Sequence, residues 1–208
     1  LNMAITLDGT TGIASVDASA SSPSIRGADA NTGIFYAADA IKFSTGGTQR
    51  AIIDNNGLSS AGHILQVVKG PTLSARISTT STTYADTGTT VNITPSATSS
   101  KIWVIASGDT WIQGTGYNAM GMLKLMRDST DLMEVYNTYD SENSSFGARL
   151  GQSHCMQILD EPSTTSQITY KVQYRVVSTN YSAIFYYPSR DDTDFYKNNQ
   201  ITVMEIAG

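Results

Sequence analysis

Residues 168–177, "ITYKVQYRVV", constrain the fold more than any other segment of the chain. Every second residue is apolar, and most of the residues between them are polar or charged. The leading apolar positions are Ile168, Tyr170, Val172, Tyr174 and Val176. Because successive side chains of a strand point to opposite faces of a sheet, this pattern predicts an antiparallel strand with one buried and one solvated face. The segment therefore favours a β fold.

Other segments after residue 100 also have the length and composition of strands. They are residues 101–107, 122–128, 131–136, 154–160, 183–188 and 201–206. The link "DST" at 128–130 is too short for a helical crossover, so the strands on either side of it should be antiparallel neighbours. Short strands at such spacings are typical of a sandwich. We therefore expect an all-β fold with an antiparallel, jelly-roll-like β-sandwich head.

The first part of the chain predicts hairpins that lack a core of their own. Residues 40–45 and 48–54 flank a glycine pair, which is a hairpin signature, and a second turn follows at 55–57. An isolated hairpin is marginal in water, and no apolar run in this part could cover its strands. We therefore expect three identical chains to wrap about a common axis and supply the missing face. A flexible linker is the alternative, because Ser, Ala and Gly are frequent between residues 14 and 33.

A change in composition near residues 62–72 predicts a boundary between two parts of the chain. We expect a short trimeric β-hairpin stalk at residues 1–62 and the sandwich head at residues 63–208. The sequence begins at Leu1 without a cationic and apolar leader, so we expect a processed or partial chain whose N-terminus continues into a longer protein.

Composition argues against several classes of partner. The formal net charge is −5 and no Lys/Arg cluster is present, so the chain lacks the basic surface that tracks phosphates, and we expect no nucleic-acid partner. No run of eighteen apolar residues exists, so we expect no membrane insertion. Cys155 is the only cysteine, which excludes an intrachain disulfide. We expect it to be a small buried residue, because His154 should lie on the opposite face of the same strand and could not activate its thiol.

Candidate catalytic and metal-binding groups are few. Asp160 and Glu161 end a strand before a proline, where we expect them to face water as turn residues rather than to act as a glycosidase pair. His63 and His154 have no partner at zinc spacing, so we expect structural roles. "GTGYNAMG" lacks the strand-to-helix context of a phosphate loop. The acidic loop that contains Asp191, Asp192 and Asp194 is a weak calcium candidate. We therefore expect no catalytic residues and no cofactor.

The polar loops between the predicted strands combine aromatic rings with amides. Sugars bind through flat apolar faces and through amide or carboxylate groups that pair with hydroxyls, and these loops hold both. The candidate ligand-binding residues are Tyr117, Asn118, Tyr139, Asn143 and Tyr181. The alternative for each ring is packing in the core or at an interface, which we expect above all for Trp111.

Ordered motifs along most of the chain resemble one family. "NTGIFYAADAIKFSTGGTQRAIIDNNG" resembles the shaft segments of tailed-bacteriophage tail fibres and appendages. The remainder is similar to the C-terminal tip domain of such fibres, especially in phages of aquatic bacteria. The motifs that carry this likeness are "STTSTTYADTG", "ITPSATSSKIWVIASG", "LMRDSTDL", "LDEPSTTSQITYKVQYR" and "ITVMEIAG".

The resemblance implies a homotrimeric fibre on the virion, joined to other tail proteins at its N-terminal end. Its head would adhere to a glycan or protein of the host surface without catalysis, and three copies would raise the avidity of weak sites. One alternative is a purely structural virion protein, that is, a connector or decoration whose head packs on other virion proteins. The other is a polysaccharide-cleaving spike.

Overall fold

The structure is a computed structural model, and it is entirely β within the residues that it describes. These are residues 18–55, 57–73, 75–114, 119–139, 148–177, 183–187 and 199–208, with the side chains at 137–139 and 148–150 left out. The predicted all-β fold is therefore confirmed for this part of the chain. By internal contacts the chain divides into two compact units, Leu1–His63 with Ala207, and Ile64–Ile206 with Gly208, the second of which we call the head. Among the described residues no helix is long and apolar enough to cross a membrane.

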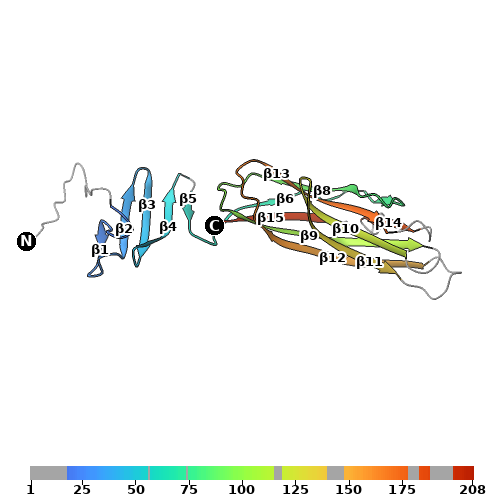
Figure 1. Ribbon diagram of the computed structural model, residues 1–208, viewed down its shortest axis with the longest axis horizontal. Coiled ribbons are helices and arrows are strands. Elements are labelled where there is room, and N and C mark those ends of the chain that lie inside the picture. Colours follow the sequence, from blue (N-terminus) through green and yellow to red (C-terminus); the bar gives the residue numbers. More distant parts are fainter. Residues whose placement is uncertain are drawn as a thin grey trace, which may run out of the picture. The chain divides into compact units, whose positions relative to one another are not determined.

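The described part of the first unit is one antiparallel sheet in which each strand pairs with the next (Figure 1). Its strands are β1 (Ile25–Arg26), β2 (Gly33–Ala37), β3 (Ala40–Thr45), β4 (Thr48–Asp54) and β5 (Gly57–Ser59). The predicted hairpin is confirmed, because Thr45 pairs with Thr48 across Gly46 and Gly47. Both glycines have positive φ, 58° and 74°, which is the conformation that a two-residue hairpin turn requires.

The strand register gathers apolar side chains on one face of this sheet. Ile41 lies opposite Ile53, and Ile53 lies opposite Leu58, so the three side chains share a face. They are 40%, 39% and 56% exposed, respectively. On the other face Phe35 is buried, and the Lys42 ammonium lies 5.8 Å from the centre of its ring. The described residues of the first unit therefore form a single layer that leaves an apolar face open.

The head is a sandwich of two antiparallel sheets (Figure 1). The smaller sheet has the order β11-β10-β13-β8, and its strands are β8 (Ala85–Ile93), β10 (Ala119–Arg127), β11 (Thr130–Tyr139) and β13 (Ile168–Val176). In the larger sheet β9 is central, with β12 along one side and β15 and β14 along the other. The strands of this sheet are β6 (Ile64–Lys69), β7 (Ile77–Thr79), β9 (Lys101–Gly114), β12 (Ala148–Asp160), β14 (Ile184–Tyr187) and β15 (Gln200–Ile206).

The core lies between these two sheets, and β13 supplies much of it. Tyr170, Val172 and Val176 are fully buried, whereas Lys171 and the other alternate residues are partly exposed, which confirms the predicted faces of this strand. The larger sheet contributes fully buried residues to the same cluster, among them Val104, Ile112, Phe185, Ile201 and Val203. Burying each such side chain contributes about 1.5 to 3 kcal/mol before entropy is counted. The head therefore buries the inner apolar faces of its two sheets against each other.

Strand β8 begins in the Ser/Thr-rich motif "STTSTTYADTG" and is not among the strands predicted from the sequence. Thr87 and Thr89 are both buried there. The Thr87 hydroxyl donates to the Val172 carbonyl at 2.7 Å, and the Thr89 hydroxyl donates to the Tyr187 hydroxyl at 3.1 Å. Threonine is β-branched and favours strands, and its buried hydroxyl is tolerated because it is hydrogen-bonded.

The prediction for Cys155 is wrong, because the cysteine is exposed. It does lie on the opposite face from His154, as expected for adjacent strand residues. Met156 is fully buried in the core, so it shows which face of β12 points inward. His154 lies two residues before Met156 and points to the same face, whereas the Cys155 thiol between them points outward.

Candidate functional site

The predicted ligand-binding side chains lie outside the residues that the structure describes. Tyr117, Asn118, Asn143 and Tyr181 belong to connections that are not described, and only the backbone of Tyr139 is placed, at the end of β11. The calcium candidates Asp191, Asp192 and Asp194 also lie outside the described residues. Among the described residues, no three His, Cys, Asp or Glu side chains gather where they could share a metal ion.

The strand ends that flank the ligand-binding candidates lie together at one end of the head (Figure 1). Ala119 at the start of β10 pairs with Tyr139 at the end of β11. Gly114 at the end of β9 pairs with Ala148 at the start of β12. Gln113 also pairs with Ile184 at the start of β14. The connections β9–β10, β11–β12 and β13–β14 therefore leave and re-enter the sandwich at the same end.

Asp160 does not face water, which corrects the sequence-based expectation. It is 8% exposed, its two carboxylate oxygens each accept a hydrogen bond from Arg127 Nη1 at 2.7 Å, and the Tyr170 hydroxyl donates to it at 2.6 Å. Asp160 ends β12 in the larger sheet, whereas Arg127 and Tyr170 belong to the smaller one. The carboxylate thus ties the two sheets together. Burial and then the hydrogen bond to Asp160 raise the pKa of Tyr170.

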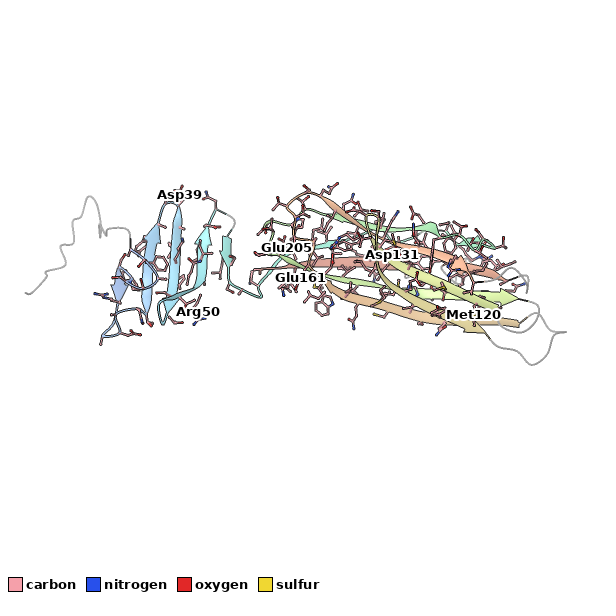
Figure 2. All side chains as sticks on the ribbon, in the orientation of Figure 1. Asp39, Arg50, Met120, Asp131, Glu161 and Glu205 are labelled. Atoms are coloured by element: carbon pink, nitrogen blue, oxygen red, sulfur yellow. The ribbon has the colours of Figure 1, made fainter. Side chains whose placement is uncertain are left out.

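Glu161, labelled in Figure 2, lies at the surface and pairs with Lys101 Nζ at 2.8 Å. Asp160 and Glu161 therefore have different environments and different partners. A glycosidase pair needs two carboxylates that face a common space, with one free to move a proton. Their arrangement is that of structural ion pairs.

Glu205, also labelled in Figure 2, is a buried acid that sequence reasoning missed. Its carboxylate accepts from Gln66 Nε2 at 2.6 Å and from the Ser96 amide and hydroxyl, each at 2.7 Å. Burial by itself raises the pKa of Glu205, but hydrogen bonds from Ser100, Gln66 and Ser96 outweigh it and hold the pKa below its usual value. Glu205 occupies an inward position of β15, and this alternation with Val203 was the signal that could have found it.

A pocket of about 140 Å³ opens between the edge strands β11 and β12 of the two sheets. Its lining consists of Thr110, Leu123, Val135, Tyr136, Gln152, Ser153, His154 and Cys155. None of the described residues in this lining is an acid, Lys or Arg, so the pocket as described suits water or a small uncharged group.

His154 contacts the ring of Tyr187, with ring centroids 5.7 Å apart. Both of its ring nitrogens are shielded from solvent and have no hydrogen-bond partner among the described residues. Burial lowers the pKa of His154 to about 4, and the Asp109 carboxylate opposes this shift in part. The imidazole is therefore neutral at pH 7, which fits the structural role expected from the sequence.

Trp111 is half-buried on the face of β9 opposite to Ile112, rather than in the core between the sheets. Its ring centroid lies 6.0 Å from that of Tyr186, its cross-strand neighbour in β14. The guanidinium of Arg76 lies 4.6 Å from the centre of the Tyr186 ring.

Two rows of side chains distinguish the outer faces of the head. On the larger sheet four residues lie directly opposite one another across β12, β9, β15 and β6. This apolar row consists of Leu159, Trp103, Met204 and Val67. On the smaller sheet a corresponding row crosses β11, β10, β13 and β8. This charged row consists of Glu134, Lys124, Gln173 and Asp86.

The charged row is held by contacts between its own members and their neighbours. Lys124 Nζ lies 3.1 Å from Glu134 and 2.5 Å from Asp131, which is labelled in Figure 2. The Gln173 amide donates to Asp86 at 2.7 Å. This face is suited to contact with water.

Comparison with known proteins finds only distant likenesses. No family model and no curated protein matches the chain. Among solved structures it is similar to the T13 particle of infectious bursal disease virus, at 9% identity over 81% of this chain and 45% of that chain, with a TM-score of 0.33. It is also similar to the insecticidal delta-endotoxin Cry8Ea1 of Bacillus thuringiensis, at 13% identity over 63% of this chain and 19% of that chain, with a TM-score of 0.30.

The chain thus spans less than half the length of either of these proteins. The likenesses are too distant to bear on what the chain does.

Proposed function

We propose that the chain is a non-catalytic structural protein of a virion, a fibre subunit that acts as a homotrimer. The observation that carries the proposal is the open apolar face that the described part of the first unit presents, formed by Ile41, Ile53 and Leu58 on a single sheet. A single sheet cannot bury such a face by itself. Three copies about a common axis would cover the faces with one another.

The resemblance of residues 31–57 to fibre shaft segments supports the same proposal, because these residues contain β2, β3 and β4. In a fibre the head would be the adhesive part. The connections with the aromatic and amide candidates are flanked by strand ends at one end of the sandwich, which supports a common binding end. A glycan or protein of the host surface is the proposed ligand.

A purely structural role, as a connector or decoration, is the second candidate. It is favoured by the apolar row of the head, because apolar patches on exposed faces mark contacts with proteins. The absence of catalysis is part of both proposals. It is supported by Asp160 and Glu161, each of which is engaged in an ion pair.

Sedimentation velocity of the purified chain tests the proposal. We expect a trimer, and we expect Ile41→Asp to dissociate it because three charges would be brought into the apolar contact. Gln49→Asp is the matched control, since Gln49 is exposed and pairs with Ser44 outside the row of Ile41 and Ile53. A folded monomer at micromolar concentration would overturn the proposal.

The adhesive role has its own test. Tyr139→Ala and Tyr181→Ala should leave the trimer intact while weakening adsorption to host cells, and the double variant should lose far more than either single one because binding is multivalent. Adsorption that survives both changes would instead favour the connector.

A further inference from the structure

The apolar row crosses the full width of the larger sheet of the head. Leu159 lies opposite Trp103, Trp103 opposite Met204, and Met204 opposite Val67. Leu159, Trp103 and Val67 are 51%, 39% and 57% exposed. The next row toward one end begins with Lys101 and continues through Ile206 to Ile64, which is also exposed. The outer face of this sheet thus carries an apolar surface formed by the apolar row together with Ile206 and Ile64 of the next row.

The opposite face of the head shows that this surface is not a general property of the sandwich. The charged row has the same length and crosses the same number of strands, yet it presents Glu134, Lys124 and Asp86. Glu161, two residues after Leu159, is already paired with Lys101 at 2.8 Å. Covering the apolar row would therefore remove apolar surface from water without burying an unpaired acid.

The size of the row indicates what covers it. Its exposed side chains offer a few hundred Å² of apolar surface, about the size at which a patch marks an interaction site. A stable complex between separate proteins buries roughly 800 Å² on each partner, so this row is too small to hold a free partner by itself. It is sufficient for copies that are already tethered elsewhere, because tethering raises their effective concentration into the millimolar range. The tether is the trimeric first unit, so this inference rests on the proposed function.

We propose that the apolar rows of three heads face a common axis and pack against one another. When three flat faces surround an axis, each contact joins opposite edges of neighbouring faces. The row ends in Leu159 on β12 and in Val67 on β6, and the two lie at the same level of the sheet. Leu159 of one copy therefore contacts Val67 of the next, while Trp103 and Met204 point toward the axis. The charged row of each copy faces water.

Disulfide cross-linking tests this arrangement in the full chain. The variant carries Cys155→Ser, which removes the only natural thiol, together with Leu159→Cys and Val67→Cys. Within one chain these positions are three strand spacings apart, about 14 Å, and cannot bridge. With copper–phenanthroline as oxidant, we expect most of the protein to run as a covalent trimer on a non-reducing gel. Either cysteine alone should leave it monomeric, because each contact joins two different edges.

The matched control places the cysteines at the ends of the charged row, Glu134→Cys with Asp86→Cys, and should not cross-link. A second pair, Gln157→Cys with Lys69→Cys, lies one row away and keeps the test decisive if the first variant does not fold. Cross-linking no greater than in the control overturns the inference, and so does a product that stops at dimers. If sedimentation still shows a trimer, the proposed homotrimer stands and only the head contact is refuted.

Discussion

The first unit and the head differ in how their sheets are covered. The described part of the first unit is a single sheet, and its row of Ile41, Ile53 and Leu58 stays open among those residues. The head stacks two sheets, and residues such as Val172 and Ile112 are fully buried between them. In both parts the strands pair antiparallel and successive side chains alternate between the two faces of the sheet. The difference is that the head has a second sheet packed against the first.

This difference bears on where the stability of each part comes from. A sandwich buries apolar surface on both inner faces, and this burial is the largest favourable contribution to folding. A lone sheet of short strands lacks that contribution and has to obtain it by association. We therefore expect the head to fold as a monomer and the first unit to depend on other copies.

The largest effect should come from a charge in the core of the head. Val172→Asp would bury an unpaired carboxylate in β13 and should destabilise the head by more than about 4 kcal/mol. Both tryptophans lie in β9, so tryptophan fluorescence during urea unfolding reports on the head alone.

Gln157→Asp is the control for this change, because Gln157 is exposed on β12. It should alter the unfolding free energy by less than about 0.5 kcal/mol. Gln173 is a poorer control, since its amide donates to Asp86 and an aspartate there would face a like charge. If Val172→Asp and Gln157→Asp had equal effects, the two-layer description of the head would be wrong.

The next effect should come from the contact that ties the two sheets. Asp160→Ala would leave Arg127 and the Tyr170 hydroxyl without their shared acceptor and should cost about 3 kcal/mol, the low end for a buried pair because Arg127 is partly exposed. The neighbouring change Glu161→Gln removes only the surface pair with Lys101 and should cost less than about 1 kcal/mol. Urea titrations of the two variants measure the contrast, and similar losses would contradict the assignment of Asp160 as the inter-sheet contact.

Acid should lower the unfolding free energy of the head by about as much as Asp160→Ala does. The pKa of His154 is about 4 in the folded state and near 6.5 when unfolded, so between these values the unfolded state binds more protons. Stability therefore falls as the pH falls from 6.5 to 4, by about 3 kcal/mol in total. The pKa of Glu205 is held below its usual value, so further loss follows below about pH 4.5 as this group takes up a proton on unfolding.

Unfolding followed by tryptophan fluorescence at several pH values tests this window. His154→Gln should remove the dependence between pH 6.5 and 4, whereas His63→Gln, at an exposed position, should retain it. An unchanged slope in His154→Gln would show that another group is responsible.

Much of the fold could be predicted from local patterns. The alternation in β13 and the glycine pair between β3 and β4 each depend on neighbouring residues, and the structure confirms both. Strand β8 is not among the predicted strands, because its threonines produce no apolar alternation, although Thr87 and Thr89 are buried with their hydroxyls paired. Strand β9 extends to Gly114, beyond the predicted end at 107, because its small and polar residues pair with β12 along their whole length.

The environment of single side chains was harder to predict, because it depends on residues that are distant in sequence. Asp160 looks like a turn residue until Arg127, 33 positions earlier, is placed beside it. The sequence places His154 and Cys155 on opposite faces, but only the packing of Met156 decides which face is inside. The apolar row needs the register of four strands, and no local pattern contains that register.

The smallest effect should arise in the first unit, at the turn between β3 and β4. Gly46→Ala and Gly47→Ala each place a side chain at positive φ, which should cost about 1 kcal/mol. For Gly46 the cost is purely conformational, since an added Cβ would meet nothing within 4 Å. Gly27→Ala has the same open surroundings without a positive φ and should stay within about 0.5 kcal/mol.

Hydrogen exchange of the amides in β3 and β4 measures this effect where it occurs. Because the described residues of the same chain form no second layer over the hairpin, the cost should appear almost entirely as faster local opening there, while the amides of β9 keep their protection. A core shared between the two parts would spread the loss to β9 as well. Slower exchange in β9 and β3 together, or equal acceleration in both, would therefore contradict the view that the first unit and the head are stabilised separately.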